Sequence, residues 1–293
     1  MTTQHPHGHG HDHTHDGNHG NHHEHQHSDE QGMAEMLDLD ALLINDHLQD
    51  IFAWTAGHQP SPRTILDLGA GTGTGTLGLA RTFPEAGVVA LDQSEFMLGR
   101  LSRKVESHGL EERVSTLQVD LDTAWPELTD VDLVWAASSM HHMSEPANVY
   151  ERIAGTLSAA GLLVVVEMDA FPRYLPRDLG FGAPGLEERC HAAVGSANWN
   201  AHPDWAGPIR EAGMAVVDQR TFGYTIDEDQ ELVARAAHRW LSRMRDALKD
   251  DLPAADLHAL DVLLDDKDPR SVLARTDLSM RGSRTVWAAR IAR

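Results

Sequence analysis

The sequence contains a single cysteine, Cys190, among its 293 residues. One thiol can form neither an internal disulfide nor a thiolate metal cluster, so the sequence excludes both kinds of cross-link. No apolar run approaches the roughly 18 residues that span a bilayer, and the amino terminus lacks the apolar core of a signal peptide. These absences predict a cytoplasmic protein that has no membrane partner.

Basic residues are also scarce. Lysine and arginine together number 24 against 45 aspartates and glutamates, which gives a formal net charge of −21. Proteins that bind nucleic acids carry basic clusters that displace counterions from phosphates, and this sequence has no such cluster. We therefore expect a small-molecule substrate and no nucleic acid partner, while the oligomeric state stays open.

The first 32 residues are rich in His, Gly, Asp and Asn, with eleven histidines between His5 and His27. Such a segment cannot bury apolar surface, so residues 1–32 are predicted to form a disordered tail. Imidazoles at alternate positions of a mobile chain can wrap around Ni²⁺, Zn²⁺, Cu²⁺ or Co²⁺. The candidate ligands are His5, His7, His9, His11, His13 and His15. A solvated tail with incidental metal affinity is the alternative.

The rest of the sequence divides into four parts. Apolar residues recur at helical intervals through residues 33–60, which predicts N-terminal cap helices. Residues 61–222 alternate expected strands and helices, a pattern typical of a doubly wound parallel sheet. The expected strands are 65–68, 88–91, 114–119, 131–137, 162–166 and 215–221. Residues 223–281 predict a helical insertion, and residues 282–293 a final strand.

The most informative stretch is an apolar run that ends in Asp67 and is followed by Gly69, Gly71 and Gly73. This pattern predicts a strand, a tight turn and the start of a helix, whose free N–H groups can bind an anionic group. Glycine lets the backbone approach a ligand closely. The order Asp-x-Gly-x-Gly-x-Gly resembles the first motif of the class I S-adenosylmethionine (SAM)-dependent methyltransferases. SAM carries both a carboxylate and positive charges.

A nicotinamide dinucleotide is the competing ligand for this stretch. Gly73, Gly75 and Gly78 form a Gly-x-Gly-x-x-Gly, the fingerprint of dinucleotide binding. That triplet falls inside the expected helix and not at the end of the strand, where the pyrophosphate would bind. The position of the triplet favours SAM over NAD.

The resemblance implies a fold, a cofactor and an activity. The fold is a Rossmann-like, doubly wound α/β sheet of seven strands with an antiparallel last strand, and the N-terminal helices and helical insertion form a cap over the substrate. The activity is methyl transfer from SAM to a small-molecule acceptor, with release of S-adenosylhomocysteine. The alternative is a metal-handling or metal-sensing protein that binds SAM without turnover, which the histidine tail would support.

Further acidic residues extend the resemblance. Asp92 ends the second expected strand, where a carboxylate can accept hydrogen bonds from a ribose diol. The resemblance assigns the adenine amino group to Asp120 and the adenine ring to the N–H of Leu121, with Asp122 as an alternative to Asp120. The complete set of expected cofactor-binding residues is Asp67, Gly69, Ala70, Gly71, Thr72, Gly73, Asp92, Gln93, Met97, Asp120, Leu121, Ala137 and Ser138.

Two adjacent histidines, His141 and His142, follow the fourth expected strand. A histidine with a pKa near neutrality can take a proton from an oxygen or nitrogen atom that attacks the methyl group, so both are candidate catalytic residues. In the alternative interpretation they pack or form hydrogen bonds at the start of a helix. Methyl transfer would then depend on the alignment of the reactants alone.

Overall fold

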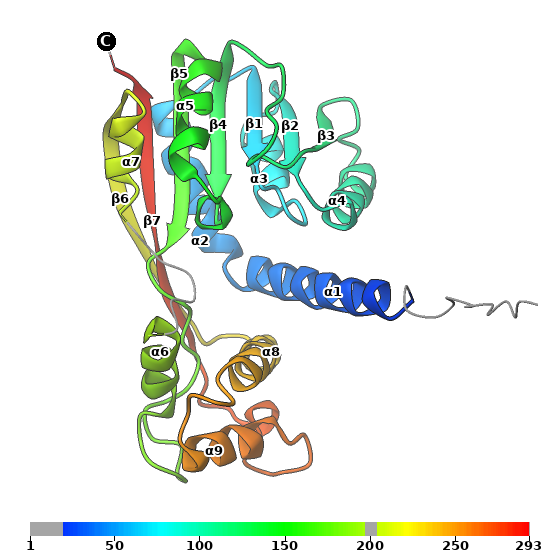
Figure 1. Ribbon diagram of the computed structural model, residues 1–293, viewed down its shortest axis with the longest axis vertical. Coiled ribbons are helices and arrows are strands. Elements are labelled where there is room, and N and C mark those ends of the chain that lie inside the picture. The colour runs from blue at the N-terminus through cyan, green and yellow to red at the C-terminus, as the bar shows by residue number, and fades with distance from the viewer. Residues whose placement is uncertain (1–19, 197–203, 293) are drawn as a thin grey trace, which may run out of the picture.

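The computed structural model describes residues 20–196 and 204–292, and a seven-stranded sheet forms its centre (Figure 1). The strand order is β3-β2-β1-β4-β5-β7-β6. Strands β1 to β5 pair in parallel, whereas β7 is antiparallel to both of its neighbours. The strands are β1 (Thr64–Leu68), β2 (Gly87–Asp92), β3 (Val114–Gln118), β4 (Val131–Ala137), β5 (Leu157–Met168), β6 (Met214–Ile226) and β7 (Met280–Ile291). The predicted fold class is confirmed.

Helices cover both faces of this sheet. They are α1 (Gly20–Leu43), α2 (Asn45–His58), α3 (Thr74–Thr82), α4 (Glu95–Ser107), α5 (Pro146–Thr156), α6 (Leu186–Ser196), α7 (Ala206–Glu211), α8 (Gln230–Ala247) and α9 (Ala254–Leu264), with 3₁₀ turns η1 (Met140–His142) and η2 (Val272–Ala274). None of the described helices is both long and apolar enough to cross a membrane.

Successive strand residues face opposite sides of the sheet, and each side packs against its own helices. Ile65 belongs to the apolar cluster that includes Phe52 of α2, and Leu66 belongs to the cluster that includes Ile153 of α5. On the first side the ring of Phe52 stacks on Trp135 of β4, with a centroid distance of 5.2 Å. Burial on both faces explains why these strands read as continuous apolar runs in the sequence.

Strands β6 and β7 extend beyond the rest of the sheet and lead into a group of helices, α6, α8 and α9, that we call the helical lobe (Figure 1). Arg189 of α6 forms a two-point ion pair with Asp256 of α9, with N–O distances of 2.8 Å. Helix α6 was not expected from the sequence. It lies within the expected core range 61–222, and it contacts α9 of the expected insertion.

Helix α1 begins at Gly20, so residues 20–32 belong to a helix and not, as expected, to a disordered tail. From Glu30 onward its side chains contact the rest of the protein: Glu30 accepts a hydrogen bond from Ser94 of α4, and Ala34 is buried. These contacts supply stability that the composition of the segment does not indicate. The six histidines proposed as metal ligands, His5 to His15, lie outside the described residues.

Candidate functional site

The glycine turn between β1 and α3 has the backbone conformation that its sequence predicts. Gly69, Gly71 and Gly73 have φ angles of 69°, 53° and 92°, a region that L-residues rarely adopt. A Cβ atom at Gly69 would lie 2.5 Å from the Cβ of Ser139, which follows β4. The turn is therefore held between the ends of β1 and β4, and glycine is required there for both conformation and space.

Asp92 lies beside this turn, as predicted. Its Oδ2 accepts a hydrogen bond from the N–H of Gly71 at 2.8 Å, and its Oδ1 accepts one from the N–H of Ser94 at 2.9 Å. Ser94 also caps α4, because its hydroxyl accepts the N–H of Met97 at 3.3 Å. The end of β2 and the glycine turn thus form one connected unit.

Asp67 has a different environment from the one the sequence suggests. Its side chain is buried, with the residue 2% exposed, and its Oδ2 accepts a hydrogen bond from the hydroxyl of Thr76 at 2.6 Å. Burial, helped by the negative charge of Asp92, raises the pKa of Asp67 to about 7, although the bond from Thr76 opposes this rise. Asp67 therefore lies beneath the turn, where it fastens α3 to β1.

The acids after β3 are divided between two roles. The carboxylate of Asp122 accepts hydrogen bonds from the N–H and the hydroxyl of Ser144, just after η1. Asp120 is exposed, and its Oδ1 accepts the N–H of Asp122 at 3.0 Å. Leu121 between them is buried. Both acids are exposed. Asp122 ties two loops together, whereas the carboxylate of Asp120 accepts a bond from within its own loop.

The remaining expected residues lie at the same edge of the sheet. Ala137 is the last residue of β4, and Ser138 has a φ of 52° and donates its N–H to Val166 of β5 at 2.8 Å. Gln93 follows β2, where its carbonyl oxygen accepts a hydrogen bond from Gln118 at 3.0 Å. The fold brings the carboxyl ends of β3, β2, β1 and β4 side by side, so the expected cofactor-binding residues gather there.

The paired histidines lie in η1, and His141 contacts an acid that the sequence analysis did not assign. His141 Nδ1 lies 2.8 Å from Glu167 Oε2, and the N–H of Met140 donates to Glu167 Oε1 at 3.0 Å. The side chains of His141 and Glu167 are 5% and 3% exposed. The ring of His142 lies 4.0 Å from that of His141, and burial, together with the neighbouring His141, lowers the pKa of His142. Glu167 fixes the orientation of His141.

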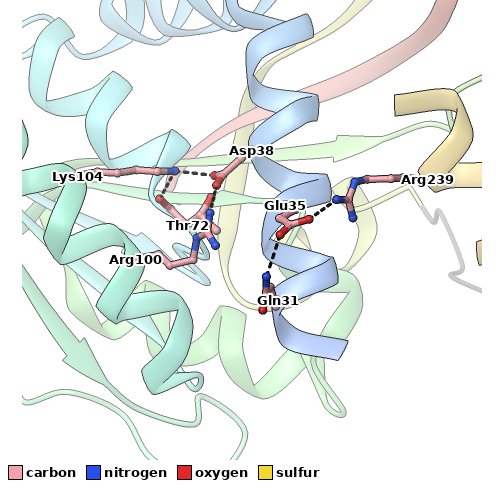
Figure 2. A network of polar contacts seen from close by, with 7 residues as sticks. All are labelled: Gln31, Glu35, Asp38, Thr72, Arg100, Lys104 and Arg239. Atoms are coloured by element: carbon pink, nitrogen blue, oxygen red, sulfur yellow. Dashed lines mark hydrogen bonds and ion pairs between the residues drawn. The ribbon is translucent and has the colours of Figure 1, made fainter. Parts of the chain in front are cut away.

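Helix α1 covers the glycine turn (Figure 2). Lys104 of α4 donates to the carbonyl oxygen of Thr72 at 2.9 Å and to Asp38 of α1 at 2.6 Å. Arg100 of α4 donates to the other oxygen of Asp38 at 2.7 Å. One turn earlier on α1, Glu35 pairs with Arg239 of α8. Helix α1 therefore connects the sheet to the helical lobe directly above the candidate site.

No three His, Cys, Asp or Glu side chains within the described ranges are placed to hold a metal ion. A cavity of about 270 Å³ lined by Thr64, Gly87 and Val114 opens at the amino ends of the strands. That is the opposite edge from the residues above, so the cavity is separate from the candidate site.

Comparison with known proteins assigns this part of the chain. A family described as "Methyltransferase domain" matches residues 65–161, from β1 into β5. Residues 65–161 are therefore similar to a methyltransferase domain. The curated relatives of the chain include trans-aconitate 2-methyltransferases from Acidovorax sp. (strain JS42), 29% identical over 137 residues, and Methylobacterium nodulans, 28% identical over 167 residues. These matches cover 46% and 55% of this chain, and the chain spans only 50% and 61% of the relatives' length.

The architecture beyond residues 65–161 also has a counterpart among solved structures. A candidate methyltransferase from Bacillus halodurans C-125 superposes with a TM-score of 0.53 at 19% identity, covering 84% of this chain and 99% of that one. A similarity at this level of identity concerns the fold. The similarity in fold therefore includes most of the chain and not only residues 65–161.

Proposed function

We propose that the chain transfers a methyl group from SAM to a small-molecule acceptor. The observation that carries this proposal is the glycine turn with three left-handed glycines, joined to Asp92 at the carboxyl edge of a sheet whose residues 65–161 match a methyltransferase domain. Free N–H groups at such a turn suit a carboxylate, and the carboxylate beside it suits a ribose.

Each part of SAM has a candidate partner. Gly69 to Gly73 would hold the methionine end. Asp92 keeps accepting capacity for the ribose diol, because each carboxylate oxygen has two lone pairs and uses one of them for the bonds to Gly71 and Ser94. Asp120 would accept the adenine amino group, since Asp122 is already bonded to Ser144.

The reacting methyl would lie near the end of β4, which Ser138 and His141 follow in the chain. SAM supplies a methyl group on a sulfonium, which leaves as neutral S-adenosylhomocysteine. If the Nδ1–H of His141 is donated to Glu167, its Nε2 is left with a lone pair that can take a proton from the attacking atom of the acceptor. This bond supports His141 as the base, and His142 is the weaker candidate because burial lowers its pKa.

Methyl transfer is tested with labelled SAM and a small-molecule extract. We expect label in a low-molecular-weight product, and no product when Gly71→Val fills the ligand side of the turn. His141→Ala should reduce turnover more than His142→Ala, without a change in the affinity for SAM. Full activity in both histidine variants would show that alignment alone drives the transfer, and absence of any labelled product would contradict the proposed function.

A further inference from the structure

Arg284 is a buried cation at the edge of the candidate site. It lies on β7, opposite Met168 of β5 and Phe222 of β6, and its side chain is 7% exposed. Its Nη1 donates to the hydroxyl of Ser138 at 2.9 Å, so the guanidinium reaches across β5 to the end of β4. A positive charge is therefore fixed at the place where the acceptor would meet the methyl group.

The charge partner of Arg284 comes from outside the sheet. Asp40 of α1, 244 residues away in sequence, places its Oδ2 2.8 Å from Arg284 Nη2. Asp169, at the end of β5, is bonded instead to Ser283 and Thr285, whose side chains alternate to the other face of β7. The Nε of Arg284 is buried without a hydrogen-bond partner among the described residues. A buried guanidinium needs its charge and its five donors matched, and the sheet alone does not do so.

Neutral polar side chains from three other segments surround this charge. Burial raises the pKa of Tyr174 well above its ordinary value and that of Tyr224 to about 12, and the charges of Asp40 and Arg284 also act on both hydroxyls. The ring of His47 lies 4.9 Å from that of Tyr224, and its Nε2 is buried without a partner among the described residues. Burial, with the nearby Arg284, lowers the pKa of His47, which favours the neutral ring. Apart from Asp40, the groups around this cation are hydrogen-bonding side chains, a setting that suits a small anion.

We propose that Arg284 binds a carboxylate of the methyl acceptor, and that the side chain of Asp40 occupies this binding site in the absence of the acceptor. The acceptor class is therefore the small carboxylic acids, an inference that rests on the proposed function. A carboxylate of the acceptor has the charge and shape of the Asp40 side chain, so one replaces the other without leaving the guanidinium unpaired. Because Asp40 lies on α1, the exchange also breaks a contact between α1 and β7.

The acceptor class is tested with a cell extract of small molecules that an anion exchanger separates into an acid fraction and a neutral-plus-basic fraction. Each fraction is incubated with the full chain and labelled SAM. Label in the acid fraction supports the proposal. Label only in the other fraction overturns it and leaves the proposed methyl transfer standing, whereas label in neither fraction contradicts both.

Variants then test the two residues separately on the acid fraction. Arg284→Met should raise the KM for the acceptor about 10- to 100-fold, since it removes hydrogen bonds to a charged group. Arg284→Lys, which keeps the charge but loses the planar fork, should raise it less. Asp40→Asn should lower the KM, because the competing charge is gone. Glu35→Gln, which breaks an α1 pair on the side of α8, is the matched control and should leave the KM unchanged.

Calorimetry with SAM on each variant distinguishes a binding role from a structural one. If both Arg284 variants lose SAM affinity together with labelling, Arg284 only supports the turn at Ser138 and the proposal fails. It also fails if Asp40→Asn raises the acceptor KM as much as Arg284→Met does, because Asp40 would then only anchor α1.

Discussion

The glycine turn offers a sharp test, because two of its glycines have the same backbone requirement but different surroundings. At Gly69 a Cβ atom would lie 2.5 Å from the Cβ of Ser139, and at Gly71 the nearest atom would be Cδ1 of Leu37 at 3.5 Å. Both have positive φ angles, so Gly→Ala costs about 1–2 kcal/mol of strain at either position. The gain from a stiffer unfolded chain is the same for both and cancels in the comparison.

Only Gly69→Ala adds a collision. The Cβ of Ser139 is fixed by its backbone, so relief requires a shift of β4 or of η1, and overpacking of this kind costs about 1–3 kcal/mol. We therefore expect Gly69→Ala to lower the free energy of unfolding by about 2–5 kcal/mol and Gly71→Ala by about 1–2 kcal/mol. Urea unfolding of the two variants and the wild type measures this difference.

The order reverses for ligand binding. A Cβ at Gly71 points into space in which only Leu37 lies within 4 Å, the side on which we expect SAM. Gly71→Ala should therefore weaken SAM binding more than Gly69→Ala does, although it lowers the free energy of unfolding less. Equal losses of stability in the two variants, or a milder effect at Gly69, would refute this geometry of the turn.

Three further predictions follow from the acids of the site. Because the pKa of Asp67 is raised to about 7, the native state holds a proton that the unfolded state loses from about pH 4 upward. The free energy of unfolding should therefore fall as the pH rises from about 4 to about 7, by about 4 kcal/mol at most. Urea unfolding at several pH values measures this slope, and Asp67→Asn should remove it. Asp92→Ala should weaken SAM binding by about 1–3 kcal/mol in calorimetry, and an unchanged affinity would remove the ribose assignment. Asp120→Ala should lower the affinity for SAM with little effect on the free energy of unfolding. Asp122→Ala should mainly lower the free energy of unfolding, and the reverse pair of results would exchange the roles of the two acids.

Local signals in the sequence predicted the central part of the site. The order of Asp67, the glycines and Asp92 depends on residues close in the chain, and the structure places them at one edge as expected. The N-cap of α4 is equally local, because the hydroxyl of Ser94 accepts the N–H of Met97 three residues later. Such features are encoded by neighbouring residues, so one sequence is enough to find them.

Contacts between residues that are distant in the sequence were not predicted from it. The bond between His141 and Glu167 exists because β4 and β5 are neighbours, and no spacing in the sequence indicates it. A signal was present, since Glu167 is a charged residue in a buried apolar strand. Likewise, β6 is longer than the expected strand 215–221, because its residues beyond Thr221 continue the pairing with β7, as Tyr224 does with Gly282.

Burial also changed the interpretation of single residues. Asp67 looked from the sequence like a ligand-facing acid, but the Thr76 hydroxyl and the body of α3 enclose it. Helix α6 lies in a segment rich in glycine and proline, and its contact with α9 through Arg189 and Asp256 is made across 67 residues of sequence. Propensity alone does not include such tertiary contacts.

The central claim is that the glycine turn and Asp92 form a binding site for SAM. Calorimetric titration of the purified chain with SAM and, separately, with NAD tests it most directly, with Gly71→Val as the control. We predict saturable binding of SAM, none of NAD, and loss of SAM binding in the variant. Binding of NAD without SAM, or SAM binding that survives Gly71→Val unchanged, would contradict the account.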